Sequence, residues 1–97
     1  MSPLPTSPPD NFTPPQQALW WLKEGGFVLG AEWEMAHGIC QTAEGTFEYD
    51  LVHALAHWIE GDISNRDYWY RRVGRGWTRA ETIAVEWGKI NSRLARD

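Results

Sequence analysis

The chain has 97 residues, which is enough for one domain with one hydrophobic core. Hydrophobic residues make up 42% of it and charged residues 23%, a composition that excludes a disordered chain. The formal net charge of −4 argues against bulk nucleic-acid binding, because that binding requires cationic groups to displace counterions from phosphates. The charge is uneven: residues 1–48 contain six acidic residues and one lysine, whereas residues 49–97 contain seven acidic and eight basic residues.

The N-terminal segment differs in composition from the rest, because all six prolines fall within residues 1–15. We expect residues 1–12 to form an extended tail and residues 13–97 to form a single all-helical domain. The sequence contains neither a signal-peptide pattern nor an apolar span of membrane length. The only cysteine, Cys40, has no partner for an internal disulfide. These features predict a cytoplasmic protein that does not associate with membranes.

Two helices are expected in the first half of the domain. The first begins at the capping-box pattern Thr13-Pro14-Pro15-Gln16 and ends at Gly25-Gly26. The second covers about residues 27–41 and carries two apolar stripes, which predicts that neighbouring helices cover both of its sides. The stripes are Val28, Ala31, Met35 and Ile39 on one side, and Leu29, Trp33, Ala36 and Cys40 on the other.

Three more helices are expected in the second half. The third runs from about Thr46 to Glu60, and Asp62 caps a fourth helix that ends at Gly74. A second capping box, at residues 78–81, predicts the start of a fifth helix whose solvent-exposed face carries Glu86. No segment shows the two-residue alternation of a strand, so the predicted fold is all-α.

A shift of 36 residues aligns many positions of the chain with one another, a period close to that of tetratricopeptide repeats. The shift places Ala18-Leu19 on Ala54-Leu55, Glu24-Gly25 on Glu60-Gly61, and Trp33 on Trp69. This pattern predicts two stacked helix-turn-helix hairpins of the tetratricopeptide or Sel1-like kind, followed by a C-terminal capping helix. Because two hairpins expose large end surfaces, the pattern also favours a homodimer.

Histidines and acidic residues form polar strips on two of the predicted helices. His53 and His57 lie four residues apart on one face of the third helix, and Glu60 continues that face. Glu34 and His37 form a similar strip on the second helix, and antiparallel packing would bring His37 close to the other two histidines. Three imidazoles and a carboxylate suit zinc or another transition metal. The spacing equally fits a hydrogen-bonded polar layer, so the sequence alone assigns neither a metal nor a cofactor.

Two other combinations of residues could carry a function, and each also has a purely structural explanation. Cys40 lies three residues after His37, but it belongs to an apolar stripe, and a buried thiol is inert. The aromatic run Tyr68-Trp69-Tyr70 lies among residues that can bind phosphate or stack on bases, namely Arg66, Arg71, Arg72, Arg75 and Arg79. Nearby acidic residues, and aromatics that point in three directions around a helix, argue against a nucleic-acid platform.

The segment from His53 to Arg75 contains the motifs His-Ala-x-x-His, Glu-Gly-Asp and Tyr-Trp-Tyr, and the upstream segment 33–41 contains Trp-x-x-Ala-His-x-Ile-x-Gln. Together they resemble an uncharacterised family of small bacterial helical proteins over about residues 33–75. Arg66 and Val73 stand where that family usually has alanine. The segment 62–73 is also similar to the second helix of Sel1-like and tetratricopeptide repeats. The resemblance implies a helical fold and a bacterial source, and it supplies no reaction.

The leading hypothesis is a small non-catalytic interaction module whose polar groove binds a protein, a peptide or a small polar ligand. The candidate groove residues are Glu34, His37, His53, His57, Glu60, Asp62, Asn65, Tyr68 and Arg72. One alternative is a metal-binding protein or enzyme that uses His37, His53 and His57. A second alternative is nucleic-acid association through the arginine-rich C-terminal half. No motif specifies a reaction, so the sequence favours binding over catalysis.

Overall fold

The computed structural model describes residues 7–95 of the chain, so the first six residues of the predicted tail lie outside the described range. Its α-helices are α1 (Pro14–Glu24), α2 (Ala31–Cys40), α3 (Phe47–Glu60), α4 (Ile63–Val73) and α5 (Ile83–Ala95), with a short 3-10 helix η1 (Gln41–Ala43) after α2. The described residues contain no strand, which confirms the all-α fold. Within them, no helix is long and apolar enough to cross a membrane.

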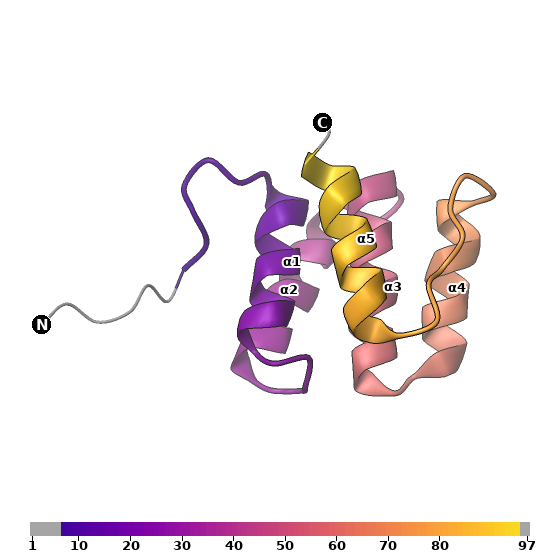
Figure 1. Cartoon of the computed structure of the whole chain (residues 1–97), viewed down its shortest axis with the longest axis horizontal. Coiled ribbons are helices and arrows are strands. Elements are labelled where there is room, and N and C mark those ends of the chain that lie inside the picture. The colour runs from indigo at the N-terminus through magenta and orange to yellow at the C-terminus, as the bar shows by residue number, and fades with distance from the viewer. Residues whose placement is uncertain (1–6, 96–97) are drawn as a thin grey trace, which may run out of the picture.

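Helix α3 is the centre of the arrangement, because it packs against each of the other four α-helices. In Figure 1, α1 and α5 lie in front of α2 and α3, and α4 lies at the right-hand edge. Eight consecutive residues of α3, from Asp50 to His57, are buried. Their apolar members form one core with buried residues of the other helices, among them Leu19, Leu22, Trp33, Ile90 and Leu94.

The predicted starts and ends of three helices are confirmed. The backbone N–H of Thr13 donates to the side chain of Gln16 (2.8 Å), which is the capping-box hydrogen bond expected at the start of α1. Gly61 ends α3 in the left-handed conformation, with φ of 85°, which favours glycine. The carboxylate of Asp62 accepts from the backbone N–H of Asn65 (3.1 Å) and so caps α4.

Helix α2 begins at Ala31, so the predicted start at residue 27 is wrong. Gly26 and Phe27 both have positive φ (74° and 59°), and two such residues in succession interrupt a right-handed helix. The apolar stripe that begins with Val28 is therefore not a packed face: Val28 is 60% exposed and Met35 is 49% exposed. Only the stripe containing Trp33, Ala36 and Cys40 is buried, although its predicted first member, Leu29, is 56% exposed.

The second predicted capping box is also wrong, because α5 begins at Ile83 and not near Thr78. Glu86 was expected on a solvent-exposed face but is completely buried. Its carboxylate accepts hydrogen bonds from the Tyr70 hydroxyl (2.6 Å), the Trp77 indole N–H (2.8 Å) and the Ala80 backbone N–H (2.9 Å). The acidic side chain thus holds the segment 74–82 against α4 and α5, which accounts for its burial.

Indole N–H groups connect helices that are distant in the sequence. Trp33 of α2 donates to the backbone carbonyl of Ala56 in α3 (2.8 Å), and Trp87 of α5 donates to that of Leu19 in α1 (2.7 Å). Tryptophan suits this role because one side chain supplies a large apolar surface and a single donor.

The two predicted hairpins differ in their connections. Helix α1 packs against α2, and α3 packs against α4. Residues 25–30 join the first pair, whereas only residues 61–62 join the second. The longer connection brings the end of α1 close to the start of α2, and a Cβ at Gly25 would lie 2.7 Å from that of Glu32. Because the two connections differ in length, the 36-residue shift aligns α1 with α3 but leaves α2 and α4 out of register.

We expect Glu86→Ala to lower the free energy of unfolding by about 3 kcal/mol, because it leaves several buried donors without their acceptor. Urea unfolding followed by tryptophan fluorescence measures this change. Glu81→Ala, which removes an exposed carboxylate from the same region, is the control and should change stability by less than about 0.5 kcal/mol. Equal effects of the two substitutions would contradict the anchoring role of Glu86.

Candidate functional site

Three histidines, the only ones in the chain, meet where α2 packs on α3. We call His37, His53 and His57 the histidine cluster. One ring nitrogen from each lies within 4.8 Å of the others. The ring centroids of His53 and His57 are 4.9 Å apart, and the centroid of His37 lies 4.9 and 5.1 Å from them. The structure therefore places three potential metal ligands around one point.

Two tryptophans pack on the histidine cluster, one from α2 and one from α4. Trp33 of α2 stacks on His37 with ring centroids 4.7 Å apart, and Trp69 of α4 stacks on His53 at 4.0 Å. The hydrogen bond from Trp33 to Ala56 fixes the first of these rings. Sequence reasoning did not assign either tryptophan to the site. The available signal was the 36-residue shift, which aligns Trp33 with Trp69 in the sequence.

Burial favours the neutral form of two members of the histidine cluster, His53 and His37. His53 is only 2% exposed, and its Nδ1 atom is buried without a hydrogen-bond partner. Burial, with smaller contributions from the neighbouring His57 and His37, lowers the pKa of His53 to about 3. Burial and the nearby His57 also lower the pKa of His37. Neutral imidazoles are the form that coordinates metal ions.

Glu60 orients one member of the histidine cluster. Its carboxylate oxygen lies 2.7 Å from Nδ1 of His57, one turn earlier on α3. In neutral His57 this contact places the proton on Nδ1, which then donates to the carboxylate. The Nε2 atom is left with its lone pair free. A carboxylate that orients a histidine in this way is a common partner of metal-ligating imidazoles.

The remaining predicted groove residues do not form one continuous lining. Asp62 lies close to His57 and Glu60, but it is also the cap of α4 and binds the side chain of Asn65 (3.2 Å). Glu34 is exposed on α2, and its charge acts to raise the pKa of His37 against the effect of burial.

Tyr68 and Arg72 form a separate pair on α4. Arg72 donates to the hydroxyl of Tyr68 (3.1 Å), and its guanidinium lies 5.4 Å from the centroid of the Trp69 ring. The contacts of Tyr68 are with side chains of α4. Arg72 also lies near Gly45 and Asp50. Neither member of the pair is placed against the histidines.

Cys40 is completely buried, and burial raises the pKa of its thiol well above the ordinary value. The expectation of an inert structural cysteine agrees with this placement. The nearby Asp50 is also buried and accepts the backbone N–H of Gly45 (3.0 Å), which anchors the start of α3 to the preceding loop.

Comparison of the chain with protein-family models, with curated proteins and with solved structures finds no match. The resemblance to a small bacterial family stays a prediction. A function for this chain therefore has to come from the geometry of its own side chains, of which the histidine cluster is the most specific arrangement.

We expect the metal-free protein to lose stability as the pH falls below 6.5. The pKa of His53 is about 3 in the folded protein and 6.5 in the unfolded chain. As the pH falls, the unfolded chain therefore becomes protonated at His53 before the folded protein does, and this favours unfolding. The free energy of unfolding is unaffected by this group above pH 6.5. Between pH 6.5 and pH 3, protonation of His53 in the unfolded chain lowers it by at most about 1.4 kcal/mol per pH unit. Urea unfolding at several pH values, in the presence of a chelator, measures the slope.

The matched variant for this measurement is His53→Leu, which fills the buried position with an apolar side chain and removes the titrating group. Its stability should vary less steeply between pH 6.5 and pH 4.5 than that of the unchanged protein, since the carboxylates that also titrate are common to both. Parallel curves for the two proteins would contradict a neutral, buried His53.

Proposed function

We propose that this protein binds a transition-metal ion through His37, His53 and His57. The observation that supports the proposal is the convergence of three ring nitrogens, one from each histidine, within 4.8 Å. Imidazole suits zinc, copper, nickel and iron, so the donor set favours a first-row transition metal over calcium or magnesium.

The alternative of a hydrogen-bonded polar layer accounts less well for the cluster. In such a layer each buried ring nitrogen meets a donor or an acceptor. His57 does so through Glu60, but Nδ1 of the more deeply buried His53 has no partner. A buried polar atom without a hydrogen bond costs about 1–3 kcal/mol. A cluster that binds a metal gives a reason to retain three imidazoles in a place where apolar side chains would pack without that cost.

The arrangement needs only small adjustments to hold a tetrahedral ion. With metal–nitrogen bonds of about 2.0 Å, the ligand atoms of a tetrahedral site lie about 3.3 Å apart. The three nitrogens are within 4.8 Å of one another, so binding an ion requires them to approach by at most about 1.5 Å. Glu60 would hold His57 with Nε2 available, and the stacked Trp33 and Trp69 would limit the orientations of the other two rings. Three protein ligands leave one coordination position for water or for an exogenous ligand.

The wider expectations from the sequence fit a metal-binding module and remain proposals. They are a binding role without catalysis, a cytoplasmic location, a bacterial source, a homodimer and a relationship to tetratricopeptide or Sel1-like repeats. The single cysteine is the sequence feature behind the expected location, since small proteins of oxidising compartments commonly carry paired cysteines.

Titration of the untagged, chelator-treated protein with Co²⁺ and Zn²⁺ tests the proposal. We expect one ion per chain, a visible Co²⁺ spectrum of tetrahedral type that Zn²⁺ removes, and a higher thermal unfolding midpoint with either metal. Because all three histidines of the chain belong to the cluster, loss of histidine-dependent binding reports on this site alone. No binding by a folded protein, or binding that His53→Ala and His57→Ala leave unchanged, would falsify the proposal.

Glu60→Gln should weaken metal binding by about 10- to 100-fold. The neutral amide orients the His57 ring less strongly than the carboxylate does, and it does not raise the basicity of the imidazole. Glu34→Gln removes an equal charge from the exposed side of α2 and is the matched control. Isothermal titration calorimetry with Zn²⁺ compares the two. Similar losses in both variants would indicate a general effect of negative charge rather than an orienting contact between Glu60 and His57.

A further inference from the structure

A second site lies on the opposite side of α4 from its contact with the histidine cluster. A shallow, open pocket of about 510 Å³ lies between α4 and the segment 74–82. We call it the arginine pocket. Its volume falls in the range of small-molecule sites, roughly 300–1,000 Å³. The lining residues that carry chemistry are Asp67, Tyr70, Arg71, Arg75, Trp77 and Arg79.

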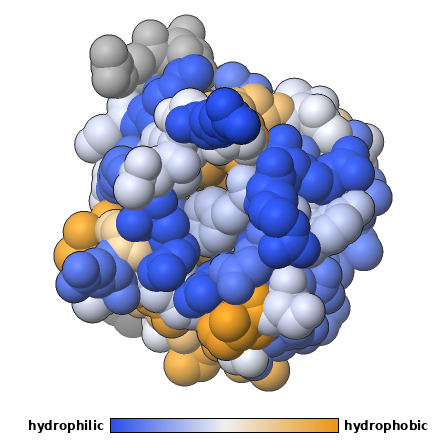
Figure 2. Space-filling model, turned by 90° about the vertical axis from the view of Figure 1, so that its right-hand side faces the viewer, coloured by the Kyte–Doolittle hydropathy of each residue, from blue (hydrophilic) through white to orange (hydrophobic). Residues whose placement is uncertain are grey.

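The arginine pocket is cationic in an acidic protein. Its lining contains three arginines and one acidic residue, whereas the whole chain has a net charge of −4. Figure 2 faces this side of the molecule, where strongly hydrophilic residues surround a paler central area. The local charge is therefore not a consequence of the overall composition, and it favours an anionic ligand.

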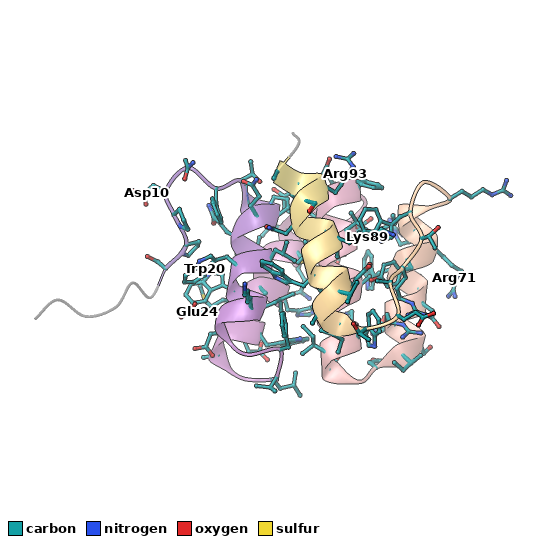
Figure 3. All side chains as sticks on the ribbon, viewed as in Figure 1. Asp10, Trp20, Glu24, Arg71, Lys89 and Arg93 are labelled. Atoms are coloured by element: carbon teal, nitrogen blue, oxygen red, sulfur yellow. The ribbon has the colours of Figure 1, made fainter. Side chains whose placement is uncertain are left out.

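Two of the three guanidinium groups in the lining have no hydrogen-bond or ion-pair partner among residues 7–95. Arg71 projects outward from α4 (Figure 3), and both it and Arg75 are exposed and make neither hydrogen bond nor ion pair with the described residues. The third, Arg79, is held in place: it lies 4.8 Å from the centroid of the Trp58 ring and donates to the carbonyl of Ala80 (2.8 Å). Planar guanidinium groups with free donors bind phosphate and carboxylate in bidentate fashion.

The aromatic residues of the arginine pocket offer ring surface rather than polar atoms. The hydroxyl of Tyr70 and the indole N–H of Trp77 both donate to Glu86 behind the pocket. Both side chains are half-buried, so part of each ring remains available to a ligand. Their fixed hydrogen bonds hold the rings in place before a ligand arrives, which suits the stacking of a flat ring.

Asp67 adds an acceptor beside this cationic and aromatic lining. One of its carboxylate oxygens is 2.9 Å from Arg66, and that ion pair moderates its repulsion of an anion. A carboxylate at the edge of an anion site is suited to accept hydrogen bonds from sugar hydroxyls. The lining as a whole combines groups for a phosphate, a flat ring and hydroxyls.

From this combination we infer that the arginine pocket binds a nucleotide, with its phosphate on Arg71 and Arg75 and its base against Tyr70 and Trp77. The nucleotide can be free or can belong to a single-stranded nucleic acid, since both present the same groups. This site is independent of the metal proposed for the histidine cluster, because none of the cluster residues lines the pocket.

Calorimetry or tryptophan fluorescence with adenosine 5′-monophosphate tests the inference, in the presence of a chelator so that no metal can hold the phosphate. We expect saturable binding that weakens as salt is added, and weaker binding of both adenosine and ribose 5-phosphate. A short single-stranded oligonucleotide, compared per site with the mononucleotide, distinguishes the two sources. Ribose 5-phosphate that binds as tightly as the nucleotide overturns the assignment, and so does the absence of binding by both the mononucleotide and the oligonucleotide.

The decisive variants remove single exposed charges and leave the fold intact. Arg75→Ala should weaken nucleotide binding by roughly tenfold, the effect of losing one charge-assisted hydrogen bond. Lys23→Ala removes the same charge from α1, which lies at the other side of the molecule in Figure 1, and should leave the affinity unchanged. Equal affinities in the two variants would place any bound nucleotide elsewhere.

Discussion

Helix α3 lies in contact with every other α-helix, and its residues from Asp50 to His57 are all buried. A helix covered on all sides has to bury whatever polar residues its sequence contains, and each of these needs a partner. Asp50 meets the backbone of Gly45, and His57 meets Glu60. His53 meets aromatic rings and other imidazoles, and its Nδ1 has no hydrogen bond. The candidate metal site thus includes His53, the buried polar residue of α3 whose hydrogen bonding the packing does not complete.

The enclosure of α3 depends on large side chains, because short helices have little area to bury. Six of the seven tryptophans are buried or pack against the core and supply that area. Several also act through their edges and faces: Trp33 and Trp87 donate to backbone carbonyls of other helices, and Trp33 and Trp69 stack on histidines. The same residues that hold the helices together also limit how the imidazoles can turn. Framework and candidate site therefore share side chains.

Glu86 connects the core to the outer face of α4. Its buried carboxylate accepts from Tyr70, Trp77 and Ala80, so the segment 74–82 follows α4 closely and forms one side of the arginine pocket. The hydroxyl of Tyr70, held against this carboxylate and buried, has a raised pKa and stays protonated as a donor. One acidic residue in the core thereby organises a cationic surface, while the histidine cluster lies on the other side of α4.

Local signals in the sequence were sufficient for the all-α class and for the starts of α1, α3 and α4. Capping residues such as Asp62 and a glycine stop such as Gly61 act through bonds within a few residues, so they can be recognised without the fold. The pairing of His53 with His57 and Glu60 followed from helical spacing for the same reason.

Tertiary structure decided the rest. Glu86 has the periodicity of a solvent-exposed residue, but its three donors come from α4 and the segment before α5, which helical periodicity cannot reveal. Val28 and Leu29 look like helical core residues, but positive φ at Gly26 and Phe27 leaves them in a loop. The position of His37 beside His53 depends on how α2 packs on α3, and the stacking of Trp69 depends on α4. These contacts join distant segments, so only the packed chain determines them.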